Sequence, residues 1–227
     1  MDSIQTTTTS PQSYARLGGM FYLLIIAAGI FGELFVRGSL VVSGNPAATA
    51  KQILSHETLW RLGIAADLLM HICDVPLMFI FYYLLKPANK NLALLALLFN
   101  LIQTAVLVAN KINLVNALLQ AKSSPALAYS TIQLHEYGFG IGLIFFGCAC
   151  LLYGYLMYHS GYFPKFLGMF LSIAGLCYLA SSFIQLISPA TAHQFGAILL
   201  LPCFIGELSV CLWLLIKGVN LDRFPVL

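Results

Sequence analysis

Six long apolar runs dominate this sequence of 227 residues. They cover approximately residues 15–36, 60–85, 92–119, 129–157, 166–187 and 195–217. An α-helix needs about 20 mainly apolar residues to cross the hydrocarbon core of a bilayer, and each run has about that length. The sequence therefore predicts an all-α, polytopic membrane protein built as a bundle of six transmembrane helices.

Composition agrees with a membrane location. Hydrophobic residues make up 60% of the chain and charged residues only 8%, whereas soluble domains are about 25% charged. The net charge of +3 is small and the basic residues form no patch, which argues against a nucleic-acid partner. The lipid bilayer is the expected partner, and the six cysteines, which lie inside the apolar runs, are interpreted as small packing residues.

Lysine and arginine predict the orientation, because these residues are enriched in cytoplasmic loops. Six of these residues lie on the side of both termini: Arg16, Lys86, Lys90, Lys165, Lys217 and Arg223. Four lie on the other side: Arg37, Lys51, Arg61 and Lys122. We therefore expect both termini in the cytoplasm. A secretory signal has a shorter apolar core than residues 15–36, so we expect a multi-pass protein of the bacterial inner (plasma) membrane without a cleaved signal peptide.

The sequence predicts a single domain. We expect residues 1–14 to form a disordered cytoplasmic tail, residues 15–220 a single six-helix domain, and residues 221–227 a second cytoplasmic tail. The longest loop, 37–58, has Pro46 where a short interfacial helix would begin, since proline is favoured in the first turn of a helix.

Ionisable residues inside the second run require an explanation. Asp67, His71 and Asp74 are spaced so that all three lie on one face of a helix. A charged side chain at the centre of a membrane helix costs at least about 2.5 kcal/mol and usually faces the bundle interior or a wet cavity. The second run therefore predicts a polar stripe that faces the other helices.

Similar residues occur in the other runs at depths that place them in the outer half of the bilayer. We expect them to converge on one level and to line a shared cavity. The structural alternative is that they form salt bridges that hold the bundle together, such as Asp67 with Arg61 or Lys111. The predicted cavity residues are Glu33, Arg37, Arg61, Asp67, His71, Asp74, Asn100, Gln103, Lys111, His135, Glu136 and Glu207.

A metal site is a weaker reading of the same residues. His71, His135 and Asp67 are chemically acceptable zinc ligands, but no HExxH or HxxxH motif pairs two histidines on one helix. We therefore predict that the protein has no cofactor. If these residues did form a metal site, zinc is the metal that they would hold.

Several blocks of the sequence resemble a known membrane family. These blocks are "GIFGELFVRGSL", "RLGIAADLL", "LHEYGFGIGLIFFGCACLLYGYL", "SGYFPKFLGMFLSIAGLCYL" and "LLLPCFIGELSVCLWLLIKGVN". They resemble the bacterial and archaeal family catalogued as domain of unknown function 4386, over about residues 15–220. The resemblance implies a single-domain, six-helix inner-membrane protein and implies no activity.

Three functions fit these observations. The leading hypothesis is a non-enzymatic protein that binds, and can translocate, a proton, a cation or a small polar solute in the polar cavity. An alternative is an intramembrane metal-dependent hydrolase that acts on a lipid-like substrate. A second alternative is a membrane scaffold or sensor whose salt bridges are purely structural.

Overall fold

The structure is a computed structural model that describes residues 10–225, apart from the side chains of 193–195 and 197. The elements are α1 (Pro11–Ile30), η1 (Phe31–Arg37), α2 (Gly38–Leu40), α3 (Pro46–Ser55), α4 (Glu57–Leu85), α5 (Lys90–Gln120), α6 (Pro125–Ser160), α7 (Lys165–Ile187) and α8 (Pro189–Ile216). The described residues contain no strand. The element η1 is a π-helix that joins α1 to α2, so Pro11–Leu40 is one continuous helical segment.

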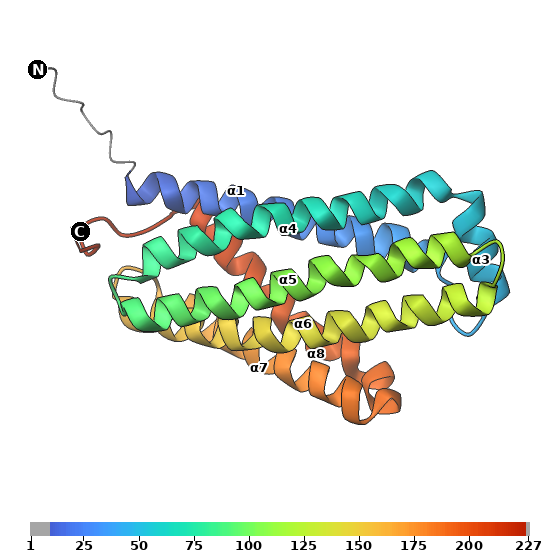
Figure 1. Cartoon of the computed structure of the whole chain (residues 1–227). Coiled ribbons are helices and arrows are strands. Elements are labelled where there is room, and N and C mark those ends of the chain that lie inside the picture. The colour runs from blue at the N-terminus through green and yellow to red at the C-terminus, as the bar shows by residue number, and fades with distance from the viewer. Residues whose placement is uncertain (1–9, 226–227) are drawn as a thin grey trace, which may run out of the picture.

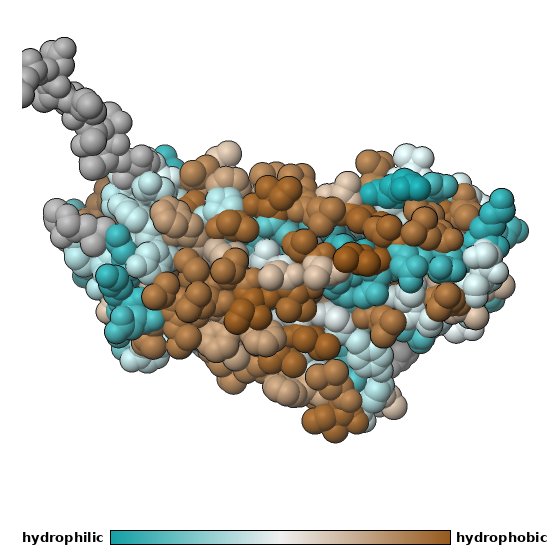
Figure 2. Space-filling model, in the orientation of Figure 1, coloured by the Kyte–Doolittle hydropathy of each residue, from teal (hydrophilic) through white to brown (hydrophobic). Residues whose placement is uncertain are grey.

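Six of these helical segments are long and apolar enough to cross a membrane, which confirms the predicted six-helix membrane bundle. They are Pro11–Leu40, Glu57–Leu85, Lys90–Gln120, Pro125–Ser160, Lys165–Ile187 and Ile198–Ile216. Figure 2 shows the apolar band that they form between two hydrophilic ends. In the same view, hydrophilic side chains extend from the α3 end toward the middle of that band.

Capping residues explain where the helices begin. The Ser10 side chain accepts a hydrogen bond from the Ser13 N–H at 3.2 Å, and α1 starts at Pro11, so residues 11–14 belong to the first helix and not to the predicted tail. Residues 1–9 and 226–227 lie outside the described residues. The predicted short helix after the first span is confirmed as α3, where Asn45 accepts from the Ala48 N–H at 3.0 Å.

The last helix is longer than its predicted apolar run of 195–217. That run contains the spanning segment Ile198–Ile216, but α8 as a whole starts at Pro189 and only Ser188 separates it from α7. Proline in the first turn of a helix requires no N–H partner, so α8 begins directly after the turn. Figure 1 shows the far ends of α7 and α8 projecting away from the other helices.

The start of α1 and the segment that follows α8 meet at the end of the bundle opposite α3 (Figure 1). The Gln12 side chain donates to the Lys217 carbonyl at 2.7 Å and accepts from the Val219 N–H at 3.0 Å. Phe224 is buried against Tyr162, with ring centroids 4.9 Å apart. Within the described part of the predicted C-terminal tail, 221–225, Phe224 therefore packs on the bundle, while the other residues are exposed.

The six long segments form a ring. Each contacts its neighbours in the order α1, α4, α5, α6, α7, α8, and α8 returns to α1. Among the described residues, the only direct contact between long helices across the ring is that of α4 with α6. Such an arrangement surrounds a central axis to which every helix contributes side chains.

Glycines bring two helices of this ring unusually close. A methyl group at Gly168 of α7 would lie 2.5 Å from the Gly154 carbonyl oxygen of α6 and 2.6 Å from the Tyr158 nitrogen. One at Gly175 would lie 2.7 Å from the Gly147 carbonyl oxygen. Small residues permit such backbone contact between membrane helices, and the α6–α7 pair depends on it.

Candidate polar site in the bundle interior

The predicted polar residues lie at two levels, and the expectation that they converge on one level is wrong. An ion-pair network occupies the half of the bundle near α3, and a separate cavity lies at the middle of the helices. The reason is helical rise: Asp67 and Asp74 share a face of α4, but about 10 Å separates their levels at 1.5 Å per residue.

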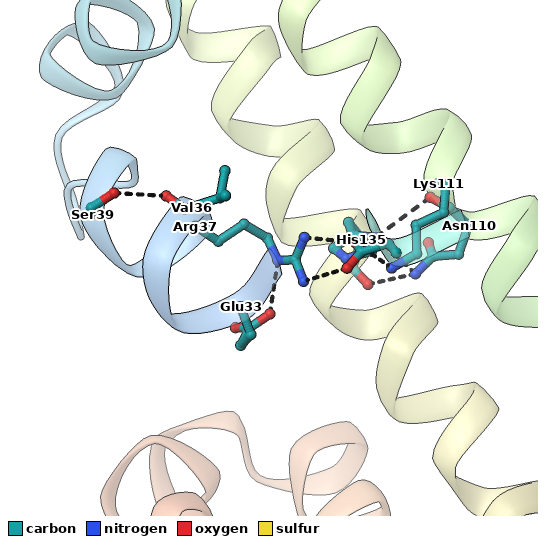
Figure 3. A network of polar contacts seen from close by, with 8 residues as sticks. Glu33, Val36, Arg37, Ser39, Asn110, Lys111 and His135 are labelled. Atoms are coloured by element: carbon teal, nitrogen blue, oxygen red, sulfur yellow. Dashed lines mark hydrogen bonds and ion pairs between the residues drawn. The ribbon is translucent and has the colours of Figure 1, made fainter. Parts of the chain in front are cut away.

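The ion-pair network is centred on Asp67. Its Oδ2 atom lies 2.7 Å from Arg37 Nη1 and 2.8 Å from Lys111 Nζ. Arg37 Nε in turn donates to Glu33 Oε2 at 2.7 Å (Figure 3). Because the Asp67 side chain is 1% exposed and that of Lys111 is 4% exposed, this network neutralises charges that have almost no access to solvent.

Local backbone structure makes room for this network. Glu33 and Arg37 lie on the π-helix η1, and a side chain at Gly32 would collide with Asp67 Oδ1. π-Helical turns are rare and occur frequently at functional sites. The glycine and the widened turn together bring Arg37 to the face of α4 that carries Asp67.

His135 belongs to the same level but has its own partner. Asn110 Nδ2 lies 3.0 Å from His135 Nδ1 and 2.8 Å from the His135 carbonyl oxygen. Gly138 allows this approach, since a side chain there would overlap the Asn110 amide. The contact fixes α5 against α6 beside Lys111 (Figure 3).

The second polar region is a cavity of about 140 Å³ at the middle of the bundle. Its lining comes from all six long helices and comprises Tyr22, Ile25, Met70, His71, Asp74, Leu77, Phe81, Asn100, Gln103, Leu107, Phe139, Leu143, Phe146, Cys150, Tyr153, Leu171, Tyr178 and Glu207. His71 and Glu207 are each the central residue of their spanning segment. The cavity therefore lies near the level that would be the bilayer midplane.

Two carboxyl groups in this cavity are held by neutral donors. Asp74 accepts from Asn100 Nδ2 at 3.2 Å and from the Thr104 hydroxyl. Glu207 accepts from the Tyr22 hydroxyl at 3.1 Å and from the Tyr178 hydroxyl. No lysine or arginine lines the cavity in the part of the chain that is described.

Three polar atoms in the cavity wall lack a hydrogen-bond partner among the described residues. They are His71 Nε2, Asn100 Oδ1 and the Tyr153 hydroxyl oxygen. Each of these residues is 3% exposed. Because buried polar groups are nearly always hydrogen-bonded in proteins, three such atoms around one cavity indicate a place for polar contents.

The twelve predicted cavity residues therefore lie in three different places. His71, Asp74, Asn100, Gln103 and Glu207 line the central cavity, and Glu33, Arg37, Asp67 and Lys111 form the ion-pair network beside His135. Arg61 and Glu136 lie elsewhere: Arg61 pairs with Glu57 at 2.7 Å with its side chain 61% exposed, and Glu136 is exposed. The predicted alternative pair of Arg61 with Asp67 is therefore wrong, and the pair of Asp67 with Lys111 is confirmed.

The metal candidates are not brought together. His71 lines the cavity, Asp67 is bound by two cations, and His135 faces Asn110. In the described part of the chain, no three His, Cys, Asp or Glu side chains gather in a way that would hold a metal ion. This geometry gives the hydrolase alternative no support.

Sequence reasoning missed the hydroxyl groups of the cavity. Four hydroxyl residues of this region were not predicted from the sequence. Tyr22, Tyr178 and Thr104 donate hydrogen bonds to the two carboxyl groups. The hydroxyl of a third tyrosine, Tyr153, has no partner among the described residues. A usable signal exists, because membrane tyrosines concentrate at the interfaces and these three lie well inside their spans.

The six spans and the central polar cavity define a multi-pass integral membrane protein. The family model described as "Domain of unknown function (DUF4386)" matches residues 17–218, and the chain belongs to this family, as its sequence blocks predicted. A protein of Archaeoglobus fulgidus, described only as uncharacterised, is 32% identical over 161 residues, which cover 71% of this chain and 86% of the relative. No solved structure matches the chain.

Proposed function

We propose that the protein binds a small polar or charged solute in the central cavity, in the plasma membrane of a prokaryote. One observation carries this proposal: three of the four unpartnered buried polar atoms in the described chain surround the same cavity. Each such atom costs about 1–3 kcal/mol if it remains unsatisfied. A solute that offers hydrogen bonds to them recovers that free energy.

The position of the cavity supports solute binding. Membrane proteins that move solutes commonly bind them near the bilayer midplane, at sites built from several helices. Here all six helices contribute to the lining, and two carboxyl groups without a basic partner face the space. We therefore assign Asp74 and Glu207 as the groups that pair with the solute, while Asp67, which we expected to line the same cavity, is occupied by Arg37 and Lys111.

The ion-pair network lies between the cavity and the α3 end. Asp67 is one helical turn from the cavity residue His71 on α4, and Lys111 is one turn from the cavity residue Leu107 on α5. Release of a solute in that direction would require the Asp67 pairs to separate. Translocation therefore demands a rearrangement of this network, whereas binding does not.

A thermal-unfolding screen tests the proposal. Purified protein in detergent is heated with sodium chloride, ammonium chloride, glycerol, benzylammonium, benzyl alcohol or benzoate. A ligand present at 100 times its Kd stabilises the folded state by about 2.7 kcal/mol, and we expect at least one solute to raise the unfolding midpoint of the wild type by several degrees. Cys150→Phe, which fills the cavity from α6, should lose this rise, and the smaller change Cys150→Leu should reduce it.

Ser182→Ala is the matched control, because the Ser182 hydroxyl is buried and unpartnered but does not line the cavity. This variant should respond to the solute as the wild type does. If no solute acts, or if the cavity-filled variants respond as strongly as the wild type, the cavity holds water alone and the proposal fails.

A further inference from the structure

We propose that the solute is an organic ammonium ion with about six to eight non-hydrogen atoms. This inference rests on the proposed function, namely that the cavity binds a solute, and adds its chemical class. The size follows from the volume of about 140 Å³, since an engineered cavity of about 150 Å³ accepts benzene.

Charge is the first argument for a cation. The outer network contains two acids and two bases, Glu33 and Asp67 against Arg37 and Lys111, and is balanced. The cavity contains Asp74 and Glu207 and, among its lining residues, no lysine or arginine. Oppositely charged groups attract strongly where water is scarce, so this cavity favours a positive occupant over a neutral or negative one.

Aromatic rings supply the second argument. Six of the lining side chains are aromatic: Tyr22, Phe81, Phe139, Phe146, Tyr153 and Tyr178. Phe81 stacks on Tyr153 with centroids 4.9 Å apart and meets Tyr22 edge-on at 6.0 Å, and Phe146 lies 5.3 Å from Tyr178. Aromatic faces attract ammonium groups, most strongly in desolvated sites, and they also accept the hydrocarbon part of an organic cation.

Hydrogen-bonding capacity supplies the third argument. The unpartnered Asn100 Oδ1 can only accept, and the Tyr153 hydroxyl and a neutral His71 ring nitrogen are able to accept as well. A primary ammonium group carries three N–H donors and no acceptor, as in lysine. Its three N–H groups can therefore donate to these atoms and to the carboxyl oxygens, whereas a carboxylate offers no donor to Asn100 Oδ1 and would lie beside Asp74 and Glu207.

Calorimetric titration with three compounds of nearly equal size isolates the charge. The compounds are benzylammonium, benzyl alcohol and benzoate. Sodium chloride is titrated as well, to test an inorganic cation. We expect benzylammonium to bind at least about tenfold more tightly than benzyl alcohol, because a hydrogen bond that involves a charged group is worth about tenfold or more in affinity. We expect no binding of benzoate or sodium.

Isosteric variants test the assigned residues. Asp74→Asn and Glu207→Gln are each checked for folding by their unfolding transitions. Each should weaken the binding of benzylammonium by roughly 10- to 100-fold, while the affinity for benzyl alcohol should change little. Tyr153→Phe keeps the aromatic ring and should reduce the affinity for benzylammonium less than Phe81→Leu, which removes an aromatic ring. Glu57→Gln removes an exposed acid that pairs with Arg61 and should have no effect.

The outcomes distinguish the two proposals. Equal or tighter binding of benzyl alcohol, benzoate or sodium, when it is lost in Cys150→Phe, overturns the ammonium assignment and leaves solute binding in the cavity standing. Equal benzylammonium affinity in the wild type and in both acid variants also overturns the assignment. If none of the compounds binds in a way that Cys150→Phe abolishes, both proposals fail.

Discussion

At the scale of single residues, two aspartates on the same face of α4 have different partners. Asp67 is bound by Arg37 and Lys111, and Asp74 by Asn100 and Thr104. The shared face could be predicted from the spacing, but the partners come from other helices and could not. The predicted partner Arg61 lies six residues from Asp67, which places it about 120° around the helix, and it pairs with Glu57 one turn away.

Asp67→Asn tests the importance of the outer network. The substitution leaves Arg37 and Lys111 in the interior without a carboxylate, and removal of one partner of a buried ion pair costs about 3–5 kcal/mol. We expect a corresponding loss in the free energy of unfolding, measured by denaturant titration in detergent. Glu57→Gln breaks the exposed pair and should change it by less than about 0.5 kcal/mol. Equal stability of Asp67→Asn and wild type would show that the network contributes nothing to the fold.

At the scale of the elements, turn residues and apolar length determined what could be predicted. The six spans and the start of α3 at Pro46 follow from these signals. The π-helix η1 did not, because FGELFVR contains no proline and its one glycine, Gly32, is of a type that regular membrane helices also contain. The glycine contacts between α6 and α7 could not be predicted either, because they depend on how the two helices lie against each other.

Gly168→Ala tests the close packing of α6 on α7. The added methyl would lie 2.5 Å from the Gly154 carbonyl oxygen, where only movement of the backbone relieves the overlap. Overpacking typically costs about 1–3 kcal/mol, so we expect a lower unfolding midpoint. Gly29→Ala is the control, since its methyl would meet only the flexible Met70 side chain at 3.3 Å. A midpoint for Gly168→Ala as high as that of Gly29→Ala would contradict the packing described.

At the scale of the whole molecule, a ring of six helices produces a site that no single helix contains. Asp74, Asn100 and Glu207 could be predicted as buried polar residues, but their meeting at one cavity depends on the order of helices around the ring. Tyr22, Tyr153 and Tyr178 were overlooked because a tyrosine inside an apolar run reads as an ordinary packing residue. The assembled cavity combines two acids, three vacant acceptors and six aromatic rings.

The central claim is that this cavity binds one cationic solute between Asp74 and Glu207. Equilibrium dialysis of radiolabelled benzylammonium against purified protein measures it most directly, with the double variant Asp74→Asn/Glu207→Gln beside the wild type. The account predicts saturation at one molecule per wild-type chain and almost no saturable uptake by the folded double variant. Equal uptake by the two proteins, or uptake that rises without saturation as partition into detergent would give, would contradict it.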